Sequence, residues 1–319
     1  MIFLLLSNTN RQMQNNFMFQ ILQRLIPLGL IMLFSFFILT CKRIDNEQVD
    51  REILAADIDT MTLVFKYNNT LFSIPSPFQV TSIIKKNNID FNKAHLSSPE
   101  NVSNYTTEFK QSLNIGIYGT DMGYLNIYDQ VPDIISYFTV IKKLSGELGL
   151  NSAFQVSLID RIEKNIDNQD SLLFFLTNTY CEFDSYLKNS NRKDVGILIV
   201  TGGWIESLYL LSQITTESKN KSRSIINRMG EQKHPLDNLI ELLSPYYYKS
   251  KEFSWLIDAL VDLAYEFDGI IFNYTYEESE VIPEQKLTII KSNSNVIISE
   301  YHIRTITQKI TSIRNTITQ

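Results

Sequence analysis

The apolar run over residues 195–214 constrains the fold more than any other part of the chain. It reads VGILIVTGGWIESLYLLSQI and contains a single charged residue, Glu206. Such a run is either a long buried helix or a buried strand that turns into a helix at the two glycines. The second alternative would suggest a dinucleotide-binding unit, but the run lacks the GxGxxG pattern and no other strand–helix alternation appears. We therefore favour a long buried helix in which Gly202 and Gly203 allow a neighbouring backbone to approach closely.

The rest of the chain repeats helical patterns. Glycine and proline are scarce, at 11 and 8 of 319 residues, which favours helices over a turn-rich β fold. Apolar residues recur at helical spacing from Pro132 to Gly149, in two segments over 152–187, after His234-Pro235 and over 253–267. Because the gaps between these segments are short, neighbouring helices should pack antiparallel. The fold class we predict is all-α, a multi-helix antiparallel bundle or array.

A last helix should begin near Ser299. Its isoleucines are spaced alternately three and four residues apart, which makes a narrow coiled-coil-like seam: Ile303, Ile306, Ile310, Ile313 and Ile317. The simplest interpretation is a face that docks on the protein's own bundle. A partner helix is the alternative.

Other segments are less regular. A helix is expected to end at Asn68-Asn69 after beginning near Val49, and a second should start at Ser98-Pro99 and run on through Tyr105. Residues 270–298 have β character and predict a small hairpin. The segment over 115–130 carries Gly116, Gly119 and Gly123 among aromatic residues. Two interpretations of this segment stay open: close helix packing, or a loop that lines a site.

The N-terminal apolar stretch Leu25–Cys41 predicts where the protein resides. It is too short to cross a bilayer comfortably, since a spanning helix takes about 20 residues, and it fits the apolar core of a secretion signal. An uncleaved anchor is the alternative. Met13 or Met18 would give the signal a more ordinary length. We therefore expect a signal peptide over 1–40, a tether and first helix over 41–70, and a single helical domain over 71–319.

The residues before Cys41 are Ile38, Leu39 and Thr40, and they resemble the bacterial lipobox. That resemblance implies that Cys41 becomes the lipidated first residue of the mature protein, attached to the cell envelope and most simply to the outer membrane. Four segments resemble an uncharacterised family of Bacteroidota lipoproteins over roughly residues 74 to 215: SIPSPFQV, SSPENVSNYTTEFKQSLNIGIYGTDMGYLNIYDQ, AFQVSLIDRIEKNIDNQDSL and VTGGWIESLYL. The resemblance implies a compartment and a helical fold, but it transfers no catalytic residue.

Composition disfavours several classes of function. The net charge is −6 and no Lys/Arg-rich run occurs, so a nucleic-acid partner is not expected. With Cys41 lipidated, Cys181 has no partner for an internal disulfide and is expected to be a small buried hydrophobe. The three histidines are far apart, so neither a metal nor another cofactor is expected. The motifs HExxH, GxSxG, CxxC and the Walker loop do not occur in the sequence.

Candidate site residues come from the two glycine-containing segments. They are aromatic and acidic side chains that could bind a sugar or another small ligand: Tyr118, Asp121, Tyr124, Trp204, Glu206 and Tyr209. The simpler interpretation is that the aromatic residues belong to the core, and that Glu206 has a definite partner because an unpaired buried charge is costly. We expect an envelope protein that binds a protein partner or a small ligand. The alternative is a hydrolase with Asp121 and Glu206 together in a pocket.

Overall fold

The structure is a computed structural model, and it describes residues 62–67, 70–75, 77–150, 192–217, 222–283, 287–289 and 291–319. The chain divides into two compact units, 1–55 and 56–319, and every described residue belongs to the second. The predictions for Cys41, Cys181 and the two helices over 152–187 lie outside the described residues. Most described residues are helical, which confirms the predicted fold class.

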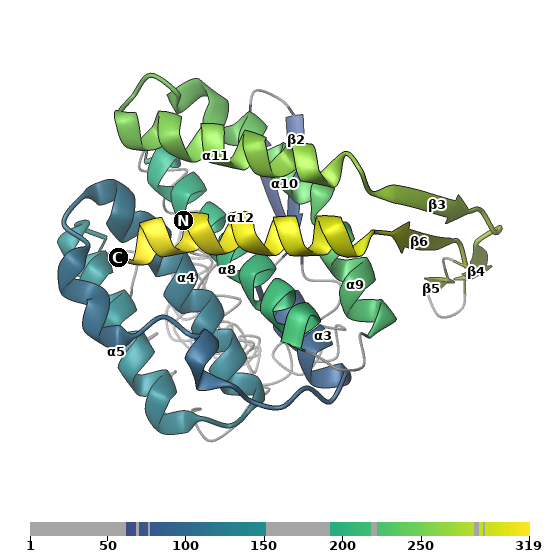
Figure 1. Cartoon of the computed structure of the whole chain (residues 1–319), viewed down its shortest axis with the longest axis horizontal. Helices are drawn as coiled ribbons and strands as arrows, with labels where there is room; N and C mark the ends of the chain where they lie inside the picture. Colours follow the sequence, from purple (N-terminus) through teal and green to yellow (C-terminus); the bar gives the residue numbers. More distant parts are fainter. Residues whose placement is uncertain are drawn as a thin grey trace, which may run out of the picture. The chain divides into compact units, whose positions relative to one another are not determined.

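The described helices pack on one another around α8 (Figure 1). The α-helices are α3 (Pro77–Lys86), α4 (Glu108–Ile127), α5 (Val131–Glu147), α8 (Lys193–Glu217), α9 (Arg223–Gly230), α10 (Lys233–Leu243), α11 (Lys251–Phe267) and α12 (Glu300–Thr318). Short 3₁₀ helices are η2 (Lys93–His95), η3 (Pro99–Asn104) and η4 (Ser244–Tyr246).

The apolar run over residues 195–214 is a helix, as predicted. Helix α8 packs against α3, α4, α9, α10 and α12, and almost all of its residues are buried. It is the one described helix that is long and apolar enough to cross a membrane, but 89% of its most apolar window is buried inside the protein. Burial on all sides explains why the helix has no polar face.

Glycines bring α4 and α8 into backbone contact. A Cβ atom on Gly116 of α4 would overlap the carbonyl oxygen of Ile199, and one on Gly202 of α8 would overlap the carbonyl oxygen of Leu113. The glycine segment over 115–130 is therefore mostly helix that packs closely, and the loop alternative is wrong for residues up to Ile127. Gly119 has open space around it, so close packing does not require every glycine.

Helix α12 docks by its isoleucine seam, as expected. Ser299 caps the helix by accepting a hydrogen bond from the main-chain N–H of His302 at 3.3 Å. The five seam residues are at most 5% exposed and join the main core: Ile303, Ile306, Ile310, Ile313 and Ile317. The seam is thus filled by this protein's own α8, α11 and α4.

Two helix predictions near the N-terminal side are wrong. Residues Thr62–Tyr67 form strand β1, which pairs antiparallel with β2 (Thr70–Pro75), so the helix expected up to Tyr67 is absent there. Short segments rich in β-branched and aromatic residues on both sides of Asn68-Asn69 favour a hairpin over a helix. The helix expected from Ser98 is interrupted, because η3 ends before Tyr105 and α4 begins with its own cap, Thr107.

The predicted hairpin near residues 270–298 exists and is longer than a simple turn. Strand β3 (Ile271–Thr275) pairs antiparallel with β6 (Asn293–Ile297), and β4 (Glu280–Ile282) pairs with β5 (Leu287–Ile289). Figure 1 shows these strands leading away from the ends of α11 and α12. We call residues 271–297 the arm, and its base is held because Val296 packs against Gly230 of α9.

Candidate functional site

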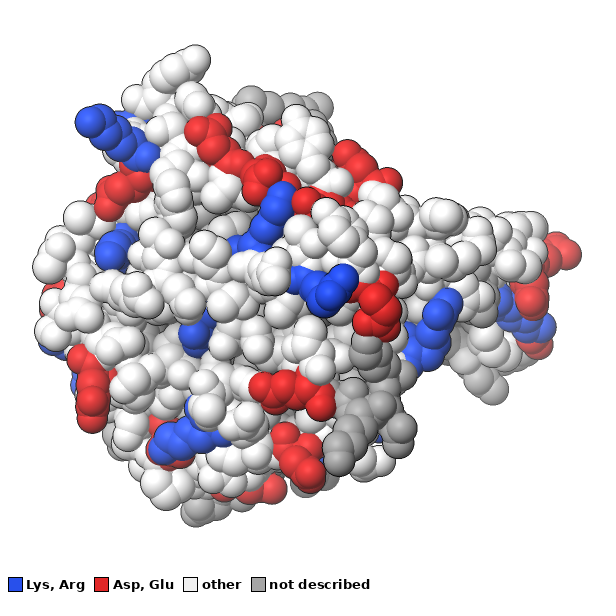
Figure 2. Space-filling model, in the orientation of Figure 1, with Lys and Arg blue, Asp and Glu red and all other residues white. Residues whose placement is uncertain are grey.

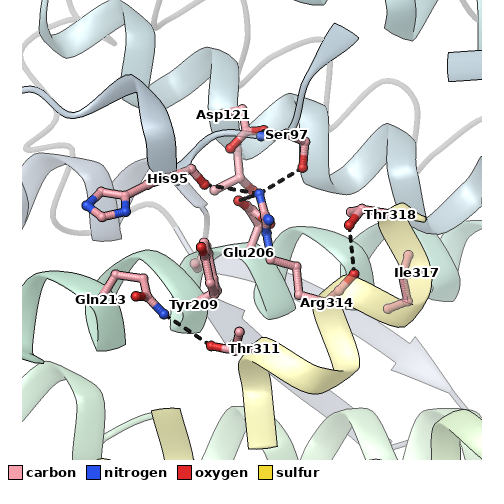
Figure 3. Close-up of polar contacts among 12 residues, drawn as sticks. His95, Ser97, Asp121, Glu206, Tyr209, Gln213, Thr311, Arg314, Ile317 and Thr318 are labelled. Carbon is pink, nitrogen blue, oxygen red and sulfur yellow. Dashed lines mark hydrogen bonds and ion pairs between the residues drawn. The ribbon is translucent and has the colours of Figure 1, made fainter. Parts of the chain in front are cut away.

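A buried cluster of charged groups joins three helices. Arg314 of α12 makes a bidentate ion pair with Glu206 of α8. The distance is 2.7 Å from Nε to Oε2 and 2.9 Å from Nη2 to Oε1. The same Nη2 donates to Ser97 Oγ at 2.8 Å and to the carbonyl oxygen of His95 at 3.0 Å. The ring of Tyr209 lies 4.2 Å from the guanidinium carbon, and Figure 3 shows these groups converging from different elements.

Asp121 of α4 is the third charged residue of the cluster. Its Oδ2 accepts a hydrogen bond from the main-chain N–H of Ser97 at 3.0 Å, whereas its Oδ1 has no hydrogen-bond partner in the part of the chain that the structure describes. Complete burial, and then the nearby Glu206 carboxylate, raise the pKa of Asp121 well above 3.8, although Arg314 opposes the shift. A raised pKa favours a neutral Asp121, so that one carboxylate and one guanidinium balance each other in the core.

Arg314 stays charged in this setting. Burial alone would lower the pKa of Arg314, but the Glu206 carboxylate raises it above its ordinary value. An ion pair sealed from water contributes little net stability on its own, whereas removing one partner is costly. The cluster can therefore fix how α12 and α8 are aligned, because a shift of either helix would break the two hydrogen bonds between Arg314 and Glu206.

The structure brings some of the predicted site residues together and separates others. Asp121, Glu206 and Tyr209 all belong to the Arg314 cluster. Tyr118 instead donates to the carbonyl oxygen of Ser98 at 2.6 Å, and Tyr124 accepts from the N–H of Asn92 at 3.1 Å.

Trp204 does not lie on an accessible surface. Its side chain is 2% exposed, and its indole N–H has no hydrogen-bond partner among the described residues. A buried ring cannot stack on a sugar, so the core interpretation of Trp204 fits the described structure better than the sugar-binding one. Asp121 and Glu206 are each 0% exposed, and neither lines the two hollows described next.

Sequence reasoning missed Arg314, Ser97 and His95. The position of Arg314 held a signal, because it lies four residues after Ile310 and three before Ile317 and so falls on the buried seam of its helix. A charged residue on an apolar seam needs a buried partner. No such signal marks His95, at the end of η2, or Ser97, just after it, although both lie more than 200 residues from Arg314 in the chain.

Two hollows open on the surface of the described residues. One, of about 420 Å³, is lined by Asn88, Ile89, Asp90, Phe91, Asn92, His95, Ile214 and Glu217. In this hollow, His95 Nε2 lies 3.1 Å from Glu217 Oε2 and 3.0 Å from Asn92 Nδ2, so the polar atoms of these three side chains contact one another. The other, of about 650 Å³, lies along α8 and α12 and is lined by uncharged polar residues, among them Gln213 and Thr311.

The histidines and acidic residues of the described ranges do not gather into a group of three that could hold a metal ion. The most distinctive chemical feature of the described residues is the buried ion pair between Arg314 and Glu206.

The arm differs sharply from the rest of the surface. Eleven large hydrophobic side chains are exposed among the described residues, and seven of them lie on the arm: Ile271, Tyr274, Tyr276, Val281, Leu287, Ile289 and Ile297. Tyr274 is 65% and Tyr276 72% exposed. Apolar side chains gathered on a projecting element are typical of an interaction site.

Comparison of the chain with protein-family models, with curated proteins and with solved structures finds no match. The resemblance to a lipoprotein family stays a prediction, and the function must be argued from the residues themselves.

Proposed function

We propose that this protein is a lipid-anchored helical protein of the cell envelope that binds a protein partner through its arm. The observation that carries the proposal is the concentration of exposed apolar side chains on residues 271–297. A two-stranded ribbon is only marginally stable in water. When a partner covers the exposed tyrosines and aliphatic residues of such a ribbon, the burial of their apolar surface lowers the free energy.

The partner is better sought among proteins than in the membrane. Figure 2 shows acidic side chains together with a basic one at the far end of the arm. Glu277 and Glu278 follow β3 in the sequence, and Glu280 of β4 pairs with Lys291 at 2.9 Å. Acidic groups are repelled by anionic lipid surfaces, which attract Lys and Arg instead. Attachment to the membrane is assigned in this proposal to a lipid on Cys41, predicted from the lipobox resemblance.

The hydrolase alternative has less support. Its two carboxylates do lie in one cluster, but both are 0% exposed and Glu206 is engaged by Arg314 through two hydrogen bonds. Hydrolysis requires that water and substrate reach the acid and base. A binding role needs no such opening in the core.

The anchor and the arm can be tested together. Tagged full-length protein would be captured from detergent-solubilised membranes, beside Cys41→Ala and beside the arm double variant Tyr274→Ser with Tyr276→Ser. We expect a co-purifying protein to be lost with the arm variant, and the Cys41→Ala protein to leave the membrane fraction and lose radiolabelled fatty acid. Tyr248→Ser is the matched control, because Tyr248 is 95% exposed but lies outside the arm. Capture that is equal for wild type and the arm variant would contradict the proposal.

A further inference from the structure

The larger surface hollow, between α8 and α12, has a lining of one chemical kind. Its volume is about 650 Å³, and among the described residues it is lined by four amide and four hydroxyl side chains. The whole chain is 44% hydrophobic and 20% charged, so a lining with neither kind of side chain is not an average sample of this protein. We call this hollow the amide groove, after its amide residues Gln213, Gln308, Asn315 and Gln319.

The two helices that form the amide groove are held together on both sides of it. Across the groove, Gln213 Nε2 of α8 donates to Thr311 Oγ1 of α12 at 3.1 Å (Figure 3). In the core, the ion pair of Arg314 with Glu206 joins the same two helices. Sites built on fixed helices place their side chains more precisely than sites built on loops. The groove is therefore formed before a ligand arrives.

Three of the amides follow one stripe of α12. Gln308, Asn315 and Gln319 are spaced seven and four residues apart, which places them on one helix face over about 17 Å. Their side chains form no hydrogen bond with any other described residue. Because an amide carries both donors and an acceptor, the stripe offers a ligand a row of unused groups of both kinds.

Two of the hydroxyls add acceptors to this row. Thr307 donates its hydroxyl proton to the carbonyl oxygen of Ile303 at 2.7 Å, and Thr316 donates to that of Ser312 at 3.0 Å. Each hydroxyl has one proton, so only oxygen lone pairs remain for a ligand at these two positions. A complementary ligand must therefore donate hydrogen bonds here and both donate and accept at the amides.

From these features we infer that the amide groove binds a neutral saccharide. Each sugar hydroxyl both donates and accepts, and the hydroxyls of a sugar ring are closely spaced, so they match a lining of amides and hydroxyls. Nucleic acids and other anionic ligands bind through Lys and Arg, and extended peptides need pockets for their side chains. The described lining supplies neither cations nor apolar pockets. The inference goes beyond the proposed function, because the groove lies on α8 and α12 and not on the arm.

The test must detect weak binding. Each hydrogen bond to the sugar replaces one to water, so its net contribution is small, and no described aromatic ring lines the groove for stacking. Saturation-transfer-difference NMR would be applied to the purified full-length protein in a detergent that has no sugar head group. The probes are three uncharged oligosaccharides, maltohexaose, mannohexaose and chitohexaose, and a neutral glycine–serine hexapeptide for comparison.

A matched pair of variants locates the binding. The groove variant, Gln308→Glu with Asn315→Asp, keeps the size of both side chains but replaces their N–H donors with carboxylate oxygens. The control, Asn104→Asp with Asn295→Asp, adds the same two charges at exposed positions outside the groove. We expect the groove variant to bind the saccharide about fivefold or more weakly, the effect of one ordinary hydrogen bond, and the control to bind like wild type. Melting temperatures would be measured on the same samples.

Each outcome decides the inference. A saccharide signal that the groove variant loses and the control keeps supports it. Wild-type protein that gives no signal with any of the three oligosaccharides would overturn it, as would equal signals from wild type and the groove variant. If only the hexapeptide binds and the groove variant loses it, the ligand is a peptide and the saccharide inference falls. The capture experiment on the arm is independent of all these results, so the proposed function stands or falls separately.

Discussion

The buried cluster and the arm reverse the usual placement of polar and apolar groups. In the core, Arg314, Glu206 and Asp121 are sealed from water, with exposures of 7%, 0% and 0%. On the arm, aliphatic and tyrosine side chains stand in solvent. The difference teaches that the two regions are built for different tasks: the first satisfies a charge in one geometry, and the second leaves apolar surface for association.

Removing the guanidinium of Arg314 should have the largest effect on the free energy of unfolding. Arg314→Met leaves Glu206 buried without its cation, and we expect the free energy of unfolding to fall by about 3–5 kcal/mol. Chemical denaturation of the purified full-length protein measures the change. The double variant Arg314→Met with Glu206→Met should regain more than half of the loss, because apolar residues of similar size replace a buried ion pair without large cost. An unchanged midpoint for the single variant would show that the pair does not hold α12.

Disturbing the close contact between α4 and α8 should have the next largest effect on the free energy of unfolding. Gly202→Ala should destabilise the protein by about 1–3 kcal/mol, since the added methyl overlaps the carbonyl oxygen of Leu113 and the helices must move apart. Gly119→Ala on α4 is the control, because nothing lies within 4 Å of the added carbon. That change should be neutral or stabilise by up to about 1 kcal/mol, as alanine favours helix more than glycine does. Equal losses for the two variants would contradict the close approach.

The ionisation of Asp121 should make the free energy of unfolding depend on pH, with a smaller effect than that of Gly202→Ala and with a definite sign. Its pKa in the folded state is raised above 3.8, so the folded protein binds this proton more tightly than the unfolded chain does. The contribution of Asp121 to stability is therefore most favourable below 3.8 and declines as the pH rises through the raised pKa. Asp121→Asn removes the decline, and the melting temperature of the variant should gain on wild type between pH 4 and pH 8.

Asp133→Asn is a suitable control for that series. Asp133 pairs with Lys93 at 2.7 Å on the surface, where ion pairs contribute about 0–1 kcal/mol. A difference in melting temperature between wild type and Asp121→Asn that stays constant with pH would contradict the neutral state of Asp121.

The comparison between cluster and arm also separates what the sequence could predict from what it could not. Local spacing revealed the isoleucine seam of α12, the helical nature of residues 195–214 and the hairpin near 270–298, because each depends on neighbours within a few residues. The contact of Arg314 with Ser97 depends instead on residues 217 positions apart, which no local pattern records. The sequence predicted a helix in place of strand β1 because Thr62–Tyr67 is short and does not alternate between apolar and polar residues: Leu63, Val64 and Phe65 are consecutive.

The smallest effect on stability is expected on the arm. Ile271 and Ile297 face each other across the paired strands β3 and β6 and are 58% and 46% exposed. Replacing both with threonine keeps β-branched side chains and should cost less than about 1 kcal/mol, the scale of a cross-strand pair. The same variant should lose its co-purifying partner, because the apolar surface that the partner covers is removed.

Ile135→Thr on α5 is the matched control, since Ile135 is 52% exposed and lies off the arm. Denaturation and capture would be measured on the same preparations. A large loss of stability in the arm variant, comparable with that of Gly202→Ala, would mean that these isoleucines serve the fold and would remove the contrast between the two regions.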